Sequence, residues 1–287
     1  MLVEATSTLQ TSGAVIDLSV SSDSLVGNVR KVNEDSYLAS TPIYLVADGM
    51  GGHRAGDQAS QAVCATFAAA FPLPLATTAE AVLDAIQASN TAVRALSGNS
   101  ATSISGTTLV GLALVEAYEG ASIHWMAFNI GDSRIYNWDG RELRQLSVDH
   151  SAVQELVEAG IITQAQAAVH PERNIVTRAI GAFDAVDADI WLLPVGGNQS
   201  FLLCSDGLTK ELSDIQIAAV LAEHDSARSE TSVAQALTAA ALAAGGKDNI
   251  AAVFVESLAS SSSLPDEDTT GRARRANAYL EDTMPRS

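Results

Sequence analysis

The chain has little cysteine, few basic side chains and no long uninterrupted apolar run. Its two cysteines, Cys64 and Cys204, lie inside apolar segments, which is typical of buried thiols in a reducing compartment rather than of a disulfide framework. No apolar run approaches the ~18 residues of a membrane helix, and the first residues lack the basic and apolar segments of a signal peptide. We therefore expect a cytoplasmic protein without a membrane-spanning segment.

The net charge of the chain also limits the kinds of partner that it can bind. The 287 residues include 34 acidic and 16 Lys or Arg side chains, which gives a formal net charge of −18. Because there is no basic stripe, we expect neither nucleic acid nor an anionic membrane as a partner. An anionic substrate such as a phosphate ester would be repelled unless bound cations reversed the local charge. Apolar residues make up 47% of the chain, enough for a sizeable buried core.

Hydrophobic periodicity predicts a layered fold. The expected strands are 16–21, 38–47 with a break at Thr41-Pro42, 107–118, 122–130, 134–138, 142–146, 188–193, 200–204 and 250–255. The expected helices are 55–71, 79–96, 152–159, 164–169, 214–222 and 232–244. Thr77 with Glu80, and Ser213 with Gln216, have the spacing of capping boxes. Hairpin-like strand pairs and paired helices favour an α+β fold over the regular alternation of a parallel sheet.

The organisation along the chain indicates one domain and a tail. No internal repeat and no linker precede the last expected strand, so we expect a single domain over residues 1–257. From Leu258 the composition changes to serines, then acids, then an arginine cluster at 272–275. This composition predicts a flexible C-terminal tail over residues 258–287, with a docking peptide around 272–280 as the alternative.

Four aspartates stand where apolar strands or a glycine turn end. Asp48, Asp132 and Asp206 each follow an apolar run, and Asp248 follows Gly245-Gly246-Lys247. Strands that deliver carboxylates to their ends can gather anionic oxygens at one place, and hard divalent cations prefer such ligands. The pattern predicts a cation site.

Two neighbouring features have more than one interpretation. The charged segment 30–35 is either a solvated loop or a group in which an arginine contacts a phosphate and an acid holds a metal-bound water. The glycines Gly49, Gly51 and Gly52 either permit close approach of backbone carbonyls to a cation or form an ordinary strand-to-helix turn.

Six short motifs together resemble one family. They occur in the order Gly27-Asn28-Val29-Arg30 through Asn33-Glu34-Asp35, Val46 through His53, Ser105-Gly106-Thr107-Thr108, Asn129 through Arg134, Cys204 through Leu208, and Gly246 through Ile250. In this order the sequence resembles the metal-dependent protein serine/threonine phosphatases of the protein phosphatase 2C family, in the compact bacterial form. The resemblance spans about residues 27–255. It implies a β-sandwich of two antiparallel sheets flanked by pairs of helices, with a metal centre at one end.

The resemblance also implies metal ligands. Asp48 would bridge two divalent metals, and the backbone carbonyl of Gly49 would bind one of them. Asp206 and Asp248 would complete the other site, and Asp132 with Asp206 would hold a third, weaker metal. Carboxylate, carbonyl and water ligands suit Mn²⁺ or Mg²⁺, two per chain with a possible third.

Other residues would support these ligands and the substrate. Glu34 would hold the cluster through metal-bound water, Asp35 and Asn249 would lie behind the ligands, and Arg30 would clamp the substrate phosphate. The implied reaction is direct attack of a metal-bridging hydroxide on phosphorus, without a covalent phospho-enzyme.

Two positions depart from the family pattern. Eukaryotic relatives carry a histidine, often proposed as the general acid, where this chain has Met50. His53 lies three positions further on and does not inherit that role. Ala251 replaces a usual threonine, a change that we expect to be tolerated.

Residues 147–181 correspond to a variable flap beside the site in bacterial relatives. Loops of this kind can read substrates. Its histidines, His150 and His170, are more often local hydrogen-bonding residues than catalysts. Arg173 and Arg178 would contact an anionic phosphopeptide or pair with acids of this chain.

The resulting functional expectation is hydrolysis of phosphoserine and phosphothreonine in proteins, opposing a Ser/Thr kinase, by a monomer. The alternatives are a catalytically weak regulator that binds phosphoproteins, and a metal phosphohydrolase that acts on other phosphate esters.

Overall fold

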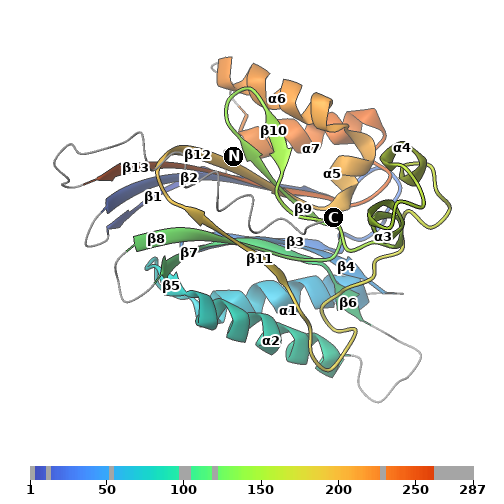
Figure 1. Ribbon diagram of the computed structural model, residues 1–287, viewed down its shortest axis with the longest axis horizontal. Helices are drawn as coiled ribbons and strands as arrows, with labels where there is room; N and C mark the ends of the chain where they lie inside the picture. The colour runs from blue at the N-terminus through green and yellow to red at the C-terminus, as the bar shows by residue number, and fades with distance from the viewer. Residues whose placement is uncertain are drawn as a thin grey trace.

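The computed structural model describes residues 4–10, 14–51, 55–96, 105–117, 122–226 and 231–261. Two sheets pack face to face, and helices cover both outer sides (Figure 1). Within these ranges, no helix combines the length and apolar character needed to cross a membrane. His53 and residues 262–287 lie outside the described residues.

The first sheet has six antiparallel strands. Their spatial order is β1 (Glu4–Gln10), β2 (Ala14–Leu25), β13 (Ile250–Ser261), β12 (Gly197–Cys204), β9 (Arg134–Trp138) and β10 (Leu143–Gln145). Strands β2 and β13 pair along their whole length, from Leu25 opposite Ile250 to Ala14 opposite Ser261. The last strand of the fold therefore lies beside one of the first.

The second sheet is built around β11 (Asp189–Pro194), β8 (Ser122–Ile130), β7 (Leu109–Ala117), β4 (Ile43–Met50) and β3 (Asp35–Ser40), in that order. The two-residue strands β5 (Thr77–Thr78) and β6 (Gly106–Thr107) pair with β7 and β4. Only the short β5–β7 pair is parallel among the described strand pairs. Antiparallel pairing thus dominates this sheet as well.

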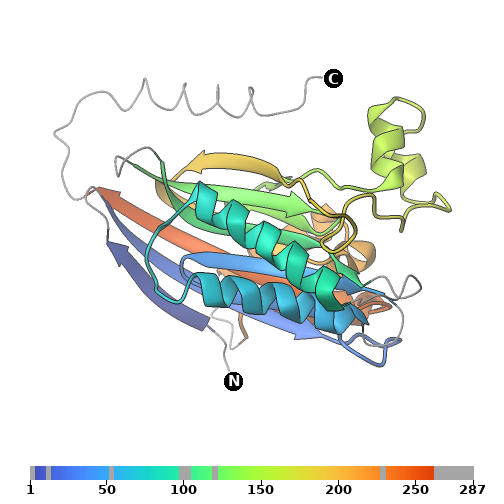
Figure 2. The same cartoon turned by 90° about the horizontal axis from the view of Figure 1, so that it is seen from below.

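Helices flank the sandwich in two groups. Helices α1 (Ala55–Ala70) and α2 (Ala79–Leu96) lie on the seven-stranded sheet, and α5 (Asp206–Glu211), α6 (Asp214–Ser226) and α7 (Val233–Ala244) lie on the six-stranded sheet (Figure 1). The short helices α3 (Ala152–Glu158) and α4 (Gln164–Ala167) belong to the flap, which projects from the body in Figure 2.

Apolar side chains fill three layers, and the central one joins the sheets. There, the ring centroid of Trp125 lies 6.2 Å from that of Tyr44 and 5.5 Å from that of Phe201. These three rings come from β8, β4 and β12 and are buried. Aromatic pairs at such separations add to the stabilisation from buried area, so the ring cluster fixes one sheet against the other.

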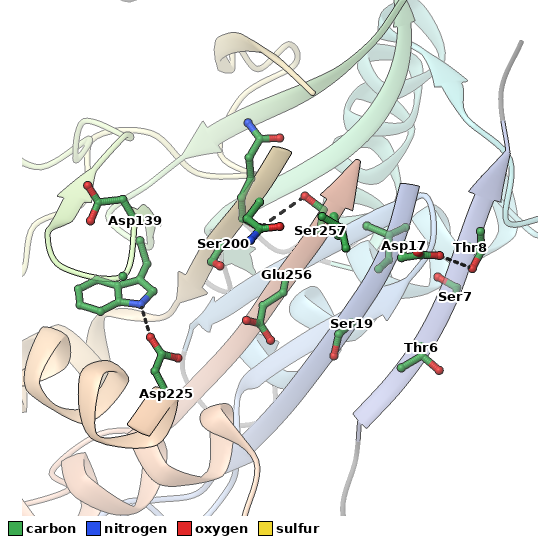
Figure 3. A pocket seen from close by; sticks show the side chains of 16 residues that line it. Thr6, Ser7, Thr8, Asp17, Ser19, Asp139, Ser200, Asp225, Glu256 and Ser257 are labelled. Atoms are coloured by element: carbon green, nitrogen blue, oxygen red, sulfur yellow. Dashed lines mark hydrogen bonds between the residues drawn. The ribbon is translucent and has the colours of Figure 1, made fainter. Parts of the chain in front are cut away.

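The outer face of the six-stranded sheet is covered over only part of its area. Helix α7 begins against β2, where the backbone N–H of Ala234 donates to Ser21 Oγ at 3.3 Å. Where α7 does not cover the sheet, Asp17 and Ser19 of β2 and Glu256 of the neighbouring β13 line a polar hollow of about 980 Å³ (Figure 3). The alternation of polar and apolar residues in β2 follows from this half-exposed position.

The layered α+β prediction is confirmed, with local corrections. Strand β1 and helix α5 were not expected, and β13 continues to Ser261, so residues 258–261 belong to a strand rather than to a tail. The cap of α2 is Thr78, whose Oγ1 accepts the N–H of Ala81 at 3.1 Å, and not Thr77. Both cysteines are free thiols, with Cys204 buried and Cys64 half-buried.

Replacement of Gly111 by alanine should destabilise the fold. Gly111 in β7 lies opposite Phe128 in β8, and a Cβ at position 111 would lie 2.1 Å from Phe128 Cζ. The Phe128 ring cannot retreat, because it stacks on Phe67 of α1 at 5.9 Å. We expect Gly111→Ala to lower the free energy of unfolding by about 1–3 kcal/mol, the usual cost of overpacking a core. Urea denaturation measures it.

Gly196→Ala provides the matched control, since nothing lies within 4 Å of a Cβ built there. Equal stabilities of the two variants would contradict the packing argument.

Candidate active site

The predicted site residues meet at one end of the sandwich. Asp35 at the start of β3 lies opposite Asp48 near the end of β4. On the other sheet, β12 ends two residues before Asp206, and its antiparallel neighbour β13 begins two residues after Asp248. Both sheets therefore deliver acidic side chains to the same edge, as the sequence pattern predicted.

Asn249 fastens the loop that carries Arg30 and Glu34. Its Nδ2 donates to the carbonyls of Val26 and Val32 at 2.8 and 2.9 Å, and its Oδ1 accepts the Glu34 N–H at 2.9 Å. All hydrogen-bonding groups of this buried amide thus hold loop backbone. Asn249 therefore holds the loop of Arg30 and Glu34 next to the start of β13.

The carboxyl groups of this edge raise one another's pKa. Burial raises the pKa of Asp48 well above its usual range, and the neighbouring Asp35, Asp206, Asp132 and Asp248 add to the effect. Burial, with repulsion from nearby carboxylates, also raises the pKa of Asp35 and of Asp132 to about 7. The five acids therefore form one electrostatic unit with a deficit of positive charge.

Two cationic side chains of the protein reach into this unit. Arg30 pairs with Asp248 through Nε–Oδ1 at 2.8 Å and Nη2–Oδ2 at 3.0 Å. The ammonium of Lys210 contacts Asp206 Oδ2 and lies 3.3 Å from Asp248 Oδ2. Although burial opposes it, these two cations lower the pKa of Asp248.

The donor set fits hard divalent cations. Both carboxylate oxygens of Asp35 and Oδ1 of Asp206 are buried without a hydrogen-bond partner, and such oxygens call for a cation or water. Within the described ranges, no group of three acidic, histidine or cysteine side chains is arranged to hold a metal ion as it stands. Oxygens of Asp206 and Asp248 pair instead with Lys210 and Arg30.

Gly49 lies where three backbone segments cross. A Cβ at this position would lie 2.1 Å from the Gly56 carbonyl oxygen and 2.6 Å from that of Glu34. The Gly49 N–H donates to the Glu34 carbonyl at 3.1 Å. Close packing of β4 against α1 and the Glu34 loop therefore requires glycine here, in addition to any role of its carbonyl.

Hydroxyl groups connect Asp48 with the Asp132 loop. Thr108 Oγ1 accepts the Asp48 N–H at 3.0 Å and lies 2.7 Å from Ser133 Oγ. Thr107 Oγ1 donates to the Asp48 carbonyl at 2.9 Å. The sequence motifs alone do not predict this role of Thr107, Thr108 and Ser133. In the sequence, these positions are marked only by the run of hydroxyl residues beside Gly106, just before β7.

Hydrogen bonds fix the base of the flap to the sandwich next to the acidic cluster. The Arg134 guanidinium donates to Asp149 through Nε at 2.9 Å and Nη2 at 2.7 Å. His150 is buried, its Nδ1 accepts the Gly131 N–H at 3.0 Å, and its Nε2 lies 3.2 Å from Asp189 Oδ2. His150 thus has the local hydrogen-bonding role expected for a loop histidine. Its partner Gly131 directly precedes Asp132 in the chain.

The other flap residues also bond within the chain. Arg178 pairs with Asp189 at 2.7 Å, so the intramolecular alternative holds for it. His170 Nδ1 accepts the Glu172 N–H at 3.2 Å. Arg173 donates to the His170 carbonyl at 3.2 Å and lines the cleft described next.

A cleft of about 690 Å³ separates the flap from α5. The three aspartates Asp132, Asp206 and Asp248 line one side of it with Lys210, and Arg173 lines the flap side. Met50 instead lines a separate hollow of about 390 Å³ with Val176 and Phe183. The site is therefore accessible from solvent beside the flap.

Comparison with known proteins identifies the family. The family profile described as Protein phosphatase 2C matches residues 29–247. The chain belongs to the protein phosphatase 2C family. It is 36% identical over 239 residues to the serine/threonine phosphatase stp of Listeria monocytogenes serotype 4b (strain F2365), which covers 80% of this chain and 92% of that phosphatase.

Solved phosphatase structures have the same fold. The PPM Ser-Thr phosphatase MsPP from Mycobacterium smegmatis, in complex with cacodylate, has a TM-score of 0.71 at 33% identity and covers 82% of this chain and 97% of its own. The catalytic domain of PstP, in complex with 2 manganese ions, has a TM-score of 0.73 at 32% identity and covers 85% and 99%. The predicted fold and enzyme class, a protein serine/threonine phosphatase, are confirmed.

His150 should make the stability of the phosphatase depend on pH. Burial lowers its pKa below the ordinary 6.5, so the folded state binds fewer protons than the unfolded chain. Its contribution is therefore present above about pH 6.5 and is lost as the pH falls through the folded-state pKa. His150→Gln keeps a donor and an acceptor but does not titrate.

The stability difference between the wild type and His150→Gln, measured by urea denaturation, should be larger at about pH 7.5 than at about pH 5.5. The same difference at both pH values would contradict the assignment.

Proposed function

We propose that the chain hydrolyses phosphoserine and phosphothreonine in proteins with the help of Mn²⁺ or Mg²⁺. The observation that carries this proposal is the set of buried, partly unpartnered carboxylates that opens into a cleft beside an arginine. Divalent cations held there would supply an activated water and offset the negative charge of a phosphate. A net charge of −18 makes such neutralisation necessary.

The ligand roles follow the positions of the acids. Asp48 lies among the carboxylates of both sheets and would bridge two ions, with the Gly49 carbonyl as a further ligand. Asp206 and Asp248 would complete one ion site from the edge of the six-stranded sheet. Asp132, whose pKa is raised by burial and by Asp206, would share a third ion with Asp206.

Three residues would support the ligands indirectly. Glu34 is half-buried, and burial raises the pKa of its carboxyl, which suits an acceptor for ordered water. Asp35 would lie behind Asp48, its register partner. Asn249 would keep the Glu34 loop in place through its three hydrogen bonds.

Arg30 would bind and orient the phosphate. Its side chain is 48% exposed at the mouth of the cluster. A guanidinium carries five N–H donors, so the contact with Asp248 does not exhaust them. Planar, paired N–H groups match the oxygens of a phosphate, which makes Arg30 a suitable clamp.

The cellular setting stays a prediction. We propose phosphorylated proteins made by a Ser/Thr kinase as substrates, action as a monomer, and a cytoplasmic location. Arg173 on the far side of the cleft would contribute positive charge toward a phosphopeptide.

Loss of one ligand should abolish turnover. We expect Asp206→Asn to lower kcat/KM on a phosphothreonine peptide by more than about 100-fold, since even residues behind metal ligands contribute about 10–100-fold. EDTA should remove the wild-type activity, and Mn²⁺ should restore it. Asp187→Asn, which changes an exposed acid outside the cluster, is the control.

Activity that survives EDTA, or full activity of Asp206→Asn, would contradict the proposal. Higher activity on a phosphodiester or a sugar phosphate than on the peptide would favour the non-protein alternative. Phosphopeptide binding without turnover would favour the regulator.

Arg30 should act mainly on substrate binding. We expect Arg30→Ala to raise KM for the phosphopeptide by about tenfold or more, the scale of a lost charge-assisted contact. Arg30→Lys should recover only part of the lost phosphopeptide binding, because an ammonium lacks the paired N–H groups of a guanidinium. Unchanged KM in Arg30→Ala would exclude the clamp.

A further inference from the structure

We propose that Lys210 is a built-in counter-ion that occupies part of the metal site and is displaced when a divalent cation binds. It would hold the carboxylates together in the metal-free phosphatase and, for the same reason, weaken metal binding. This inference rests on the proposed function, because it assumes that Asp206 and Asp248 are metal ligands.

The position of Lys210 follows from helix geometry. Asp206 is the first residue of α5, and Lys210 lies four residues later on the same face of the helix. Its ammonium contacts Asp206 Oδ2 and lies 3.3 Å from Asp248 Oδ2. One positive charge thus bridges the two acids that are expected to share one ion.

Lys210 also faces a further acid of the cluster. It lines the cleft together with Asp132, Asp206 and Asp248. The ammonium therefore lies beside three of the four aspartates for which metal contacts are expected.

Arg30 cannot replace this charge. It approaches Asp248 from the loop that also carries Glu34, and its exposed guanidinium makes no ion pair with Asp206 within the described residues. Only Lys210 among the described cations pairs with Asp206. Without it, a largely buried carboxylate would be left unpaired, which is strongly destabilising.

The same contacts conflict with a bound metal. A divalent ion bound to Asp206 and Asp248 would need the carboxylate oxygens that Lys210 contacts. The ion and the Lys210 ammonium would then lie close together and repel each other. The lysine side chain is 37% exposed and has a flexible stem, so it can move into the cleft. Oδ1 of Asp206, which has no partner, can accept the incoming ion first.

Isothermal titration of the metal-free, full-length protein with Mn²⁺ tests the proposal. The variants are Lys210→Gln, Lys210→Arg and, as a control for charge near the cleft, Lys247→Gln. We expect Lys210→Gln to bind Mn²⁺ about tenfold or more tightly, because no ion pair must be broken. Lys247→Gln and Lys210→Arg should stay close to the wild type.

Thermal unfolding in EDTA supplies the second readout. Lys210→Gln should unfold at a lower temperature than Lys247→Gln, and saturating Mn²⁺ should remove this difference. Lys210→Arg should keep the wild-type value, which separates the role of charge from a general folding defect.

Unchanged or weaker Mn²⁺ binding by Lys210→Gln, with normal binding by the wild type, would overturn the inference and leave the proposed function intact. Failure of every variant to bind Mn²⁺ would overturn both. Mn²⁺ binding by Lys210→Gln alone would support strong competition by the lysine.

Discussion

Repulsion among buried carboxylates is the constraint on which the rest of this structure depends. Asp35, Asp48, Asp132, Asp206 and Asp248 gather at one sheet edge, where burial and mutual repulsion raise the pKa of four of them. Such an arrangement persists only if the surrounding fold is rigid and supplies positive charge. The Trp125–Phe201 contact between the sheets contributes to the rigidity, and Arg30 and Lys210 provide part of the charge.

The supporting framework is mainly backbone held by polar side chains. Asn249 fixes the Glu34 loop, and the Thr108 hydroxyl links the Asp48 strand to the Asp132 loop. Each of these contacts joins segments far apart in the chain. Site geometry is therefore a property of the whole sandwich and not of any one motif.

Much of this arrangement could be predicted from the sequence. The position of Asp48 and Asp206 follows from apolar runs that end in acids, and that of Asp248 from a glycine turn. Strand β8 was predicted at its observed bounds. Strand β1 has weaker alternation and owes its place to pairing with β2. The contact of Lys210 with Asp248 could not be predicted, because Asp248 comes from a distant turn that only the folded sheet brings near.

The attachment of the flap base affects how the sequence of this enzyme can diverge in evolution. Arg134 holds Asp149 and Gly131 holds His150 at the sandwich, while helices α3 and α4 lie beyond that attachment (Figure 2). Arg173 follows these helices in the chain and lines the cleft. We expect substitutions beyond the attachment to alter the cleft wall and to leave the acidic cluster in place. Substrate preference can therefore diverge while the chemistry stays constant.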